Sequence, residues 1–320
     1  MSQVIGRLGH IALQVPNLDE SVTDATKILG LREVECRDGT VYLTCDEHHH
    51  ALEFSEAAVA GLDHVGLQAR SPQALELLHT ALQREGVPIL SETPEEPGLA
   101  QAIRFPTPGG HIFEVFLPVP GAAPYDVRGE RSGHLTADLL FNGPGMRPRI
   151  LGHALLKTEN VTEMADFLTR LLDFKLSDTA LGGDVVWLRC NPDHHAINLL
   201  RGPAGLHHVA WELENWTDLE RMADHMLANG KRLFAGPGRH GPGHNLFMYH
   251  LAPAGYLVEH FSDLQRIYDD AAHRPLDWSL DPHWVNQWGP PPPADFVERG
   301  IGLAVPASMP NTAAPESRSG

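Results

Sequence analysis

The stretch LHHVAWELENWTDLERMADHMLANG (206–230) decides the fold, because it joins two patterns in a fixed order. It starts with the alternation of apolar and other side chains that is typical of a strand, with histidines near its beginning. The remainder has the apolar spacing of a helix, and Gly230 suits the helix end. Similar strands occur around His10 (LGHIALQV), His64 (LDHVGLQA) and His153 (LGHALLKT), each followed by a helical pattern. The chain therefore repeats one structural unit.

The repeating unit is βαβββ, since two or three short strands separated by Gly, Pro and Asp turns follow each helix. His10 and His64 are 54 positions apart, and His153 and His208 are 55 apart. These equal spacings predict an α+β chain of four βαβββ modules, paired into two domains. Four helices are expected, at 17–31, 71–87, 160–174 and 216–230.

The expected domain organisation follows from the repeat and from shifts in composition. The segments are an N-terminal domain at 1–120, a connector rich in Pro and Gly at 121–147, a C-terminal domain at 148–262, an appendix at 263–304 and a disordered tail at 305–320.

Composition excludes several classes of protein. The net charge of −17 disfavours broad nucleic-acid binding, which needs a basic face. No apolar stretch approaches a membrane span, so no membrane partner is expected. The three cysteines lack CxxC spacing, which argues against a disulfide framework and fits a reducing cytoplasm. The unusual feature is the 20 histidines, because imidazole is the commonest metal ligand.

One set of residues at repeated module positions predicts a metal site. His153 and His208 lie near the starts of the third and fourth modules, and Glu259 lies on the final strand of the fourth. Two imidazoles and one carboxylate form the facial triad of non-haem Fe(II) oxygenases, which leaves adjacent positions open. The spacing alone leaves His207 as an alternative to His208, because neighbouring strand residues face opposite sides.

Four stretches carry a resemblance to a known family: GRLGHIALQV, GHALL, LHHVAWELENWTDLERMAD and GPGRHGPGHNLFMYHLAPAGYLVEHF. Together they resemble the vicinal oxygen chelate superfamily, and within it the two-domain type I extradiol dioxygenases of the catechol 2,3-dioxygenase branch. The resemblance covers residues 6 to about 265. It implies that each domain is a curved mixed sheet that encloses a metal-site cavity.

The resemblance also implies roles for particular residues. His153, His208 and Glu259 match the metal ligands of the family, so the second histidine of LHHV is the ligand. His240 and Tyr249 match, in spacing, the family residues that hydrogen-bond the catecholate oxygen.

A further family histidine, beside the oxygen-binding position, acts as acid and base. The candidates are His194 and His195 in DHHAINLL. His195 is the choice, because it sets Ile197 and Leu199 where the family has alternating apolar residues.

The implied activity is extradiol (meta) ring cleavage of a catechol-type aromatic by O2 at a mononuclear Fe(II), with Mn(II) as the alternative ion. The product would be a hydroxymuconic semialdehyde, in the catabolism of aromatic compounds. The family also implies a homo-oligomer. No arginine equivalent to those that pair with carboxylated catechols is found, so an uncharged catechol is expected.

A rival interpretation places an isomerase or lyase site in the first half. The set His10, Glu53, His64 and Glu114 resembles the two-His, two-Glu metal site of glyoxalase-type members. A shift of 145 positions, however, aligns His240 with Glu95 and Tyr249 with Arg104. The first half thus lacks the acid–base pair, and no catalytic metal is expected there.

A non-catalytic binding protein is a further alternative, although such a protein needs no acid–base residues around a metal. The histidine tract at 48–50 lies in a loop before a strand and is predicted to be a solvated turn.

Overall fold

The computed structural model describes residues 4–120 and 147–305. The first half contains β1 (Ile5–Val15), α1 (Leu18–Thr23), a π-helical turn (Asp24–Ile28), β2 (Arg32–Arg37), β3 (Thr40–Thr44), β4 (Leu52–Glu56), β5 (Gly61–Ala69), α2 (Pro72–Arg84), β6 (Leu99–Pro106) and β7 (Ile112–Pro118). The second half contains β8 (Ile150–Thr158), α4 (Val161–Leu172), β9 (Lys175–Ala180), β10 (Val185–Arg189), β11 (Ile197–Arg201), β12 (Gly205–Glu212), α5 (Trp216–Ala228), β13 (Ala235–Arg239), β14 (Leu246–Leu251) and β15 (Leu257–Ser262).

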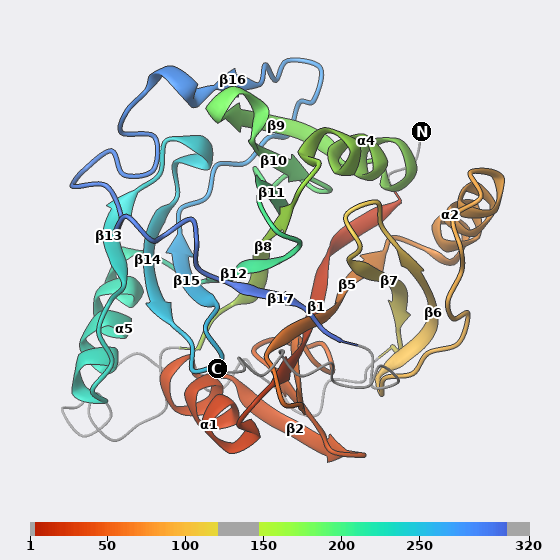
Figure 1. The fold of residues 1–320 in the computed structure, drawn as a ribbon, viewed down its shortest axis with the longest axis horizontal. Helices are drawn as coiled ribbons and strands as arrows, with labels where there is room; N and C mark the ends of the chain where they lie inside the picture. The colour runs from red at the N-terminus through yellow and green to blue at the C-terminus, as the bar shows by residue number, and fades with distance from the viewer. Residues whose placement is uncertain (1–3, 121–146, 306–320) are drawn as a thin grey trace, which may run out of the picture.

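The two halves share one plan of strand pairing. In the first half the order across the sheet is β2-β3-β4-β1-β5-β7-β6. In the second it is β9-β10-β11-β8-β12-β15-β14-β13. Each is a mixed sheet, with β1 and β5, or β8 and β12, as antiparallel central pairs. The predicted α+β fold of four βαβββ modules is confirmed, and Figure 1 shows the two curved sheets side by side.

The helices begin where the sequence predicts, because each has a capping side chain. Asn17, Ser71, Asn160 and Asn215 each accept a hydrogen bond from the backbone N–H three residues later. Such caps stabilise a helix by about 1 kcal/mol. The helix expected at 17–31 is the one departure, since the α-helix ends at Thr23 and continues as the π-helical turn.

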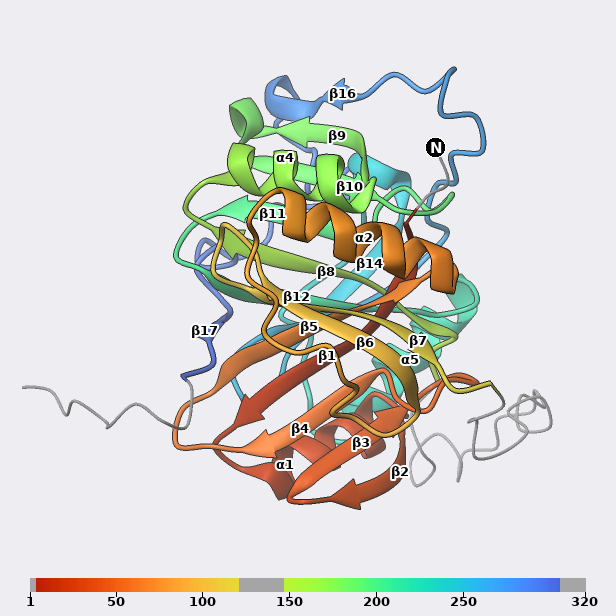
Figure 2. The same cartoon turned by 90° about the vertical axis from the view of Figure 1, so that its right-hand side faces the viewer.

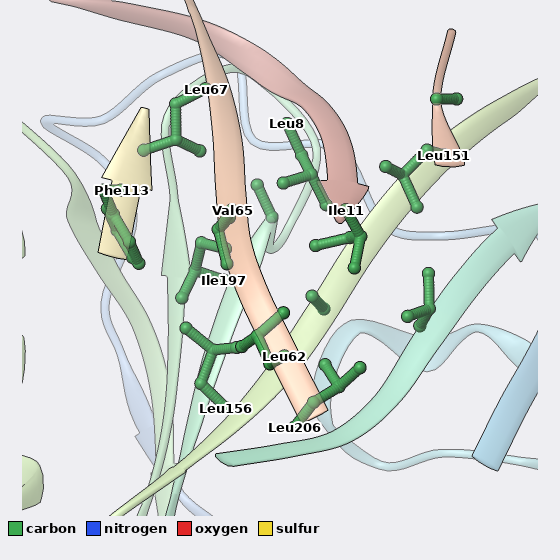
Figure 3. Packing of buried hydrophobic residues seen from close by; sticks show 14 of the residues in the cluster. Leu8, Ile11, Leu62, Val65, Leu67, Phe113, Leu151, Leu156, Ile197 and Leu206 are labelled. Atoms are coloured by element: carbon green, nitrogen blue, oxygen red, sulfur yellow. The ribbon is translucent and has the colours of Figure 1, made fainter. Parts of the chain in front are cut away.

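One apolar core joins the halves. Figure 3 shows Leu8, Ile11, Leu62 and Val65 of the first half packed with Leu151, Leu156, Ile197 and Leu206 of the second. Burying one such side chain contributes about 1.5–3 kcal/mol. Helices α2 and α4 also lie side by side across the junction, as Figures 1 and 2 show.

The segment after β15 connects the halves and covers the second one. β17 (Ile301–Leu303) pairs with β12 of the second half and with β5 of the first. This close approach requires glycine at Gly205, where a Cβ atom would lie 2.1 Å from the carbonyl oxygen of Ile301. β16 (Leu276–Asp277) extends the sheet at β9. The residues expected as an appendix are thus an integral layer of the fold.

Two expected segments fall mainly outside the described residues, namely the connector at 121–147 and the tail at 305–320. Within residues 4–120 and 147–305, no helix has both the length and the apolar character that a membrane crossing requires.

Candidate metal centre and active site

The central strand β12 brings the three predicted ligands together. Ala210 stands opposite His153 of β8 on one side and opposite Glu259 of β15 on the other. His208 lies two residues before Ala210 and therefore on the same face of the strand. Because the alanine side chain is small, the three longer side chains converge above it.

A β-bulge explains why the side chains of His207 and His208 do not both join the ligand cluster. Between β12 and β8 the register runs from Leu206 opposite Leu156 directly to His208 opposite Leu155. His207 is therefore the extra residue of the bulge. Its side chain does not join the ligand cluster but contacts the later segment of the chain.

The three side chains have the geometry of metal ligands. Glu259 Oε2 lies 3.2 Å from His153 Nε2 and 3.4 Å from His208 Nε2. One donor atom from each of the three lies within 4.8 Å of the others, and all three residues are buried. His208 Nε2 has no hydrogen-bond partner among the described residues. Donors about 3 Å apart are spaced as adjacent ligands of an ion about 2.1 Å from each. The residues present thus fit a divalent metal.

A chain of hydrogen bonds orients His208 for this role. His207 Nε2 lies 2.7 Å from the carbonyl oxygen of Phe296, to which it donates a proton. His207 Nδ1 then accepts from His208 Nδ1, 2.9 Å away. In this arrangement the neutral His208 ring has its lone pair on Nε2, toward the cluster. Partners that fix the ring tautomer in this way are typical of metal-binding histidines.

The carboxylate of Glu259 is held ionised at the centre of the site. Tyr249 donates its hydroxyl to Oε2 at 2.6 Å, and Asn245 donates its amide to Oε1 at 3.0 Å. Burial by itself would raise the pKa of Glu259, but the neighbouring His153, His208 and His240 hold that pKa below its usual range. Glu259 is therefore ionised, as a metal-binding carboxylate has to be, and is not a proton donor.

His240 and Tyr249 form the predicted pair beside the ligands. His240 Nδ1 donates to the carbonyl oxygen of Val285 at 2.6 Å, and its Nε2 lies 3.1 Å from the Tyr249 hydroxyl. The imidazole stacks on Phe247 with ring centroids 3.8 Å apart. Burial lowers the pKa of His240, while burial and Glu259 raise the pKa of Tyr249 well above its ordinary value. Both groups are therefore neutral in the metal-free site.

His195 enters the same site from the segment before β11. Its ring centroid lies 4.2 Å from that of His153, whereas His194 turns away and bonds Asp178 at 3.2 Å. Strand alternation does not set the directions of these two side chains, because β11 begins only at Ile197. A bend rather than strand alternation separates the two rings. Burial and His153 hold the pKa of His195 well below its ordinary value.

A cavity of about 300 Å³ opens over these residues. Its wall is mostly apolar and includes Leu155, Val185, Trp187, Trp284 and Phe296. Among the described residues, Glu259 is the only Asp, Glu, Lys or Arg that lines it. This cavity is lined by the three candidate metal ligands and by His195, His240 and Tyr249.

Several residues that contribute to the site are not marked by any pattern in the sequence. Asn245 bonds Glu259, and His207 orients His208. Trp284 and Phe296 close the cavity from the segment after β15, where no periodic pattern marks them. A buried asparagine or a tryptophan in a loop carries no local signal, so only the tertiary structure identifies these residues.

The first half has a histidine and a glutamate at the same strand positions as the second, but an arginine lies beside them. His10 and Glu114 both stand opposite Gly66 of β5, as His153 and Glu259 stand opposite Ala210. Arg104, however, donates to Glu114 at 2.9 Å and to Glu95 at 2.8 Å, and it also bonds Glu96. A guanidinium thus occupies the place of the acid–base pair that the second half has.

Paired βαβββ modules with a His-His-Glu cluster define a protein that chelates a divalent metal inside a curved sheet. The Glyoxalase/Bleomycin resistance protein/Dioxygenase superfamily model matches residues 7–115 and 150–260. The chain belongs to this superfamily, in its type I extradiol dioxygenase branch.

Two curated relatives extend over most of the chain. The manganese-dependent 2,3-dihydroxybiphenyl 1,2-dioxygenase of Geobacillus genomosp. 3 is 32% identical, in an alignment that includes 87% of this chain and 91% of the dioxygenase chain. The metapyrocatechase of Geobacillus stearothermophilus is 30% identical, over 87% of this chain and 86% of the metapyrocatechase chain.

Solved structures agree with the fold. A Mn(II)-bound glyoxalase from Novosphingobium aromaticivorans superposes with a TM-score of 0.79 at 27% identity, over 97% of each chain. The 2,3-dioxygenase LapB from Pseudomonas sp. KL28 gives a TM-score of 0.77 at 27% identity, over 87% of this chain and 99% of its own.

Proposed function

We propose that the protein is an extradiol dioxygenase, similar to catechol 2,3-dioxygenase, that opens the ring of an uncharged catechol with O2. The observation that supports this function is that six side chains line one cavity, namely the candidate ligands His153, His208 and Glu259 and the candidate acid–base residues His195, His240 and Tyr249. A glyoxalase-type isomerase in the first half is disfavoured, because Arg104 there holds the carboxylates of Glu95 and Glu114. A passive binding protein would not need this acid–base set.

A divalent metal bound at the triad would supply Lewis acidity toward the catechol hydroxyls and adjacent open positions for the catechol and O2. Fe(II) is the ion that we propose, and Mn(II) is the alternative, since both accept two imidazoles and one carboxylate. The name of one relative specifies manganese. Metal analysis together with reconstitution by each ion distinguishes the two.

His240 and Tyr249 orient the ring oxygens of the substrate. Their polar atoms lie 3.1 Å apart, and the Tyr249 hydroxyl also reaches Glu259. A catecholate oxygen near them can accept a hydrogen bond from the Tyr249 hydroxyl, and from His240 Nε2 once that imidazole takes up a proton, and so keep its charge. The stack of His240 on Phe247 fixes the orientation of the imidazole ring.

His195 acts as the acid–base residue, on the side of the three ligands opposite His240 and Tyr249. His194 Nε2 donates to Asp178 at 3.2 Å, so His194 Nδ1 accepts from His195 Nδ1 at 3.0 Å. In the neutral form, the lone pair of His195 is then on Nε2. A base in this position can take a proton from the substrate and return it during ring opening.

The cavity wall selects against charged substrates. No lysine or arginine among the described residues lines it, so a carboxylate on the ring would be buried without a cation. Leu155, Val185, Trp187 and Trp284 instead favour an apolar ring substituent. The expected product is a hydroxymuconic semialdehyde or its ketone analogue, in aromatic catabolism.

The remaining proposals concern organisation and setting. We place catalysis in residues 148–262, with the N-terminal domain at 1–120 in a non-catalytic role. A homo-oligomer in the cytoplasm fits the family and the free cysteines Cys36, Cys45 and Cys190. Light scattering on the purified protein tests the oligomer.

The decisive experiment is anaerobic loading with Fe(II) or Mn(II), followed by a panel of catechols and O2. Yellow product with 3-alkylcatechols or 3-phenylcatechol, and little with carboxylated catechols, is expected. Conversion of a hemithioacetal without ring cleavage would instead support an isomerase. Binding of catechol without O2 uptake in the metal-loaded protein would support a binding protein.

A further inference from the structure

The histidine tract at 48–50 is not the solvated turn that the sequence predicts. His50 is only 4% exposed, although it lies in the loop between β3 and β4. Its ring packs against His10 of β1 with centroids 4.6 Å apart, and against Tyr42 of β3 at 5.2 Å. The loop thus inserts an imidazole into the first half, at a position with no part in the proposed reaction.

His50, His10 and Glu53 form a second cluster of two imidazoles and one carboxylate. Glu53 Oε1 lies 3.0 Å from His50 Nε2 and 3.5 Å from His10 Nε2. One donor atom from each of the three lies within 4.8 Å of the others, and all three residues are buried. These separations resemble those around Glu259 in the second half, which are 3.2 and 3.4 Å.

Two of the three donor atoms of this cluster lack hydrogen bonds, and the third, His10 Nε2, lies 3.1 Å from His64 Nε2. Within the described part of the chain, neither His50 Nε2 nor Glu53 Oε1 has a hydrogen-bond partner, despite the short distance between them. His49 Nε2 faces Glu35 Oε1 at 3.5 Å, and with its proton on that side His49 Nδ1 accepts from His50 Nδ1 at 3.0 Å, which leaves the His50 lone pair on Nε2. Two buried acceptors that face each other are unfavourable unless a cation lies between them.

Arg104, the arginine at the centre of the first half, forms no ion pair with Glu53. Arg104 bonds Glu95, Glu96 and Glu114, and no ion pair joins Glu53 to a lysine or arginine within residues 4–120 and 147–305. The positively charged partner of the buried Glu53 carboxylate must therefore be a protonated histidine or a bound ion. Glu53 also lines a cavity of about 280 Å³, through which an ion can reach it.

We propose that His10, His50 and Glu53 form a second site for a divalent transition-metal ion, with Zn²⁺ as its representative. Two imidazoles and a carboxylate suit Zn²⁺, with water as a fourth ligand. This set differs from the one that the sequence suggests, because His50 replaces His64 and Glu114. Arg104 holds Glu114 and lies 3.4 Å from His64 Nε2, so those donors serve the guanidinium. The ion would tie the 46–50 loop to β1.

The test isolates this site in the full-length chain. His153→Ala with Glu259→Ala disables the site in the second half. After treatment with chelator, this double variant should bind one equivalent of Zn²⁺ in a calorimetric titration checked by metal analysis. Adding His50→Gln should abolish that equivalent. Adding His48→Gln should retain it, because His48 lies beside Asp46 and Arg7 rather than in the cluster.

Several results would overturn the proposal. One is a folded double variant that binds no Zn²⁺, and another is retention of the equivalent after His50→Gln. Loss with Glu114→Gln but not with His50→Gln would assign the ion to the other set. Circular dichroism checks each fold, and Glu53→Gln replaces His50→Gln if the latter does not fold. In the otherwise unchanged protein, His50→Gln should lower bound Zn²⁺ from two equivalents to one, while ring cleavage by the Fe(II)-loaded protein stays unchanged.

Discussion

His194 and His195 are neighbours in the chain and are hydrogen-bonded to each other through Nδ1 atoms 3.0 Å apart. Asp178 anchors the outer ring, and its carboxylate also accepts hydrogen bonds from Trp278 Nε1 at 2.7 Å and from the Leu276 backbone at 2.8 Å. The segment after β15 therefore fixes the tautomer of an imidazole in the active site. The two histidines form one unit in which only His195 reaches the cavity.

The first prediction separates the two members of this unit. His195→Gln should retain the metal and anaerobic catechol binding but slow the oxygen-dependent steps by about 10²–10⁴-fold, because the group that returns a proton during ring opening is lost. His194→Gln should have a smaller effect, about 10–100-fold, because it removes only the partner that orients His195. Single-turnover mixing of each enzyme–catechol complex with O2 measures both. Equal defects, or the larger one in His194→Gln, would contradict these roles.

The second prediction concerns the carboxylate ligand. Glu259→Gln keeps the shape of the side chain but removes the negative charge that lies 3.2 and 3.4 Å from the two imidazoles. We expect a folded protein with less than stoichiometric metal at the triad and no detectable ring cleavage. The matched control is Glu212→Gln at the end of β12, where the carboxylate faces Arg149 at 3.8 Å. Metal analysis with circular dichroism decides, and full occupancy in Glu259→Gln would remove this residue from the ligand set.

The sequence predicts the modules and the cluster positions because both depend on local periodicity. A histidine near the start of a strand and a glutamate near the end of a module recur at nearly fixed spacing, so the spacing selects His153, Glu259 and the pair His207 and His208. The family resemblance then selects His208 within that pair. The structure places these three within one cluster. The order of the four modules follows from the same repeat.

Other parts of the site could not be predicted, since they depend on packing between distant segments. The β-bulge that turns His207 toward Phe296 arises from the pairing of β12 with β8. The cavity wall formed by Trp284 comes from a segment with no helical or strand period. The burial of His50 depends on a loop that folds against β1, whereas its polar sequence indicates a solvated turn.

The third prediction is that the metal-free protein loses stability as the pH falls below about 6.5. Burial and His250 hold the pKa of His260 well below its ordinary value, and burial likewise lowers the pKa of His10 and His208. Below the ordinary imidazole pKa the unfolded chain binds more protons than the folded one. The free energy of unfolding therefore falls with the pH, and its full value is present only above that range.

Melting temperatures between pH 8 and pH 5, measured with a chelator present, test this prediction. His260→Gln should flatten the dependence, because one buried imidazole no longer titrates on unfolding. His79→Gln is the control, since that partly exposed ring pairs with Glu92 at the surface. A melting temperature that stays constant or rises toward pH 5 would contradict the prediction.

The last prediction assigns substrate selection to the layer that follows β15. Trp284 lines the cavity and packs on Trp187 with ring centroids 5.7 Å apart and planes at 80°. Trp284→Ala should therefore remove apolar contact area from a ring substituent and leave the ligands in place. Trp284 is partly buried, and for the apolar contact between its indole and a bound substituent a loss of about 1.5–3 kcal/mol corresponds to roughly 10–150-fold. We expect this loss in kcat/KM for 3-phenylcatechol, mainly through KM, with a much smaller change for unsubstituted catechol. Trp288→Ala is the matched control, because Trp288 is 57% exposed and contacts Trp216 rather than the cavity. Steady-state kinetics with both catechols measure the difference. An equal loss for the two substrates in Trp284→Ala would show that the tryptophan supports the fold of the site rather than the choice of substrate.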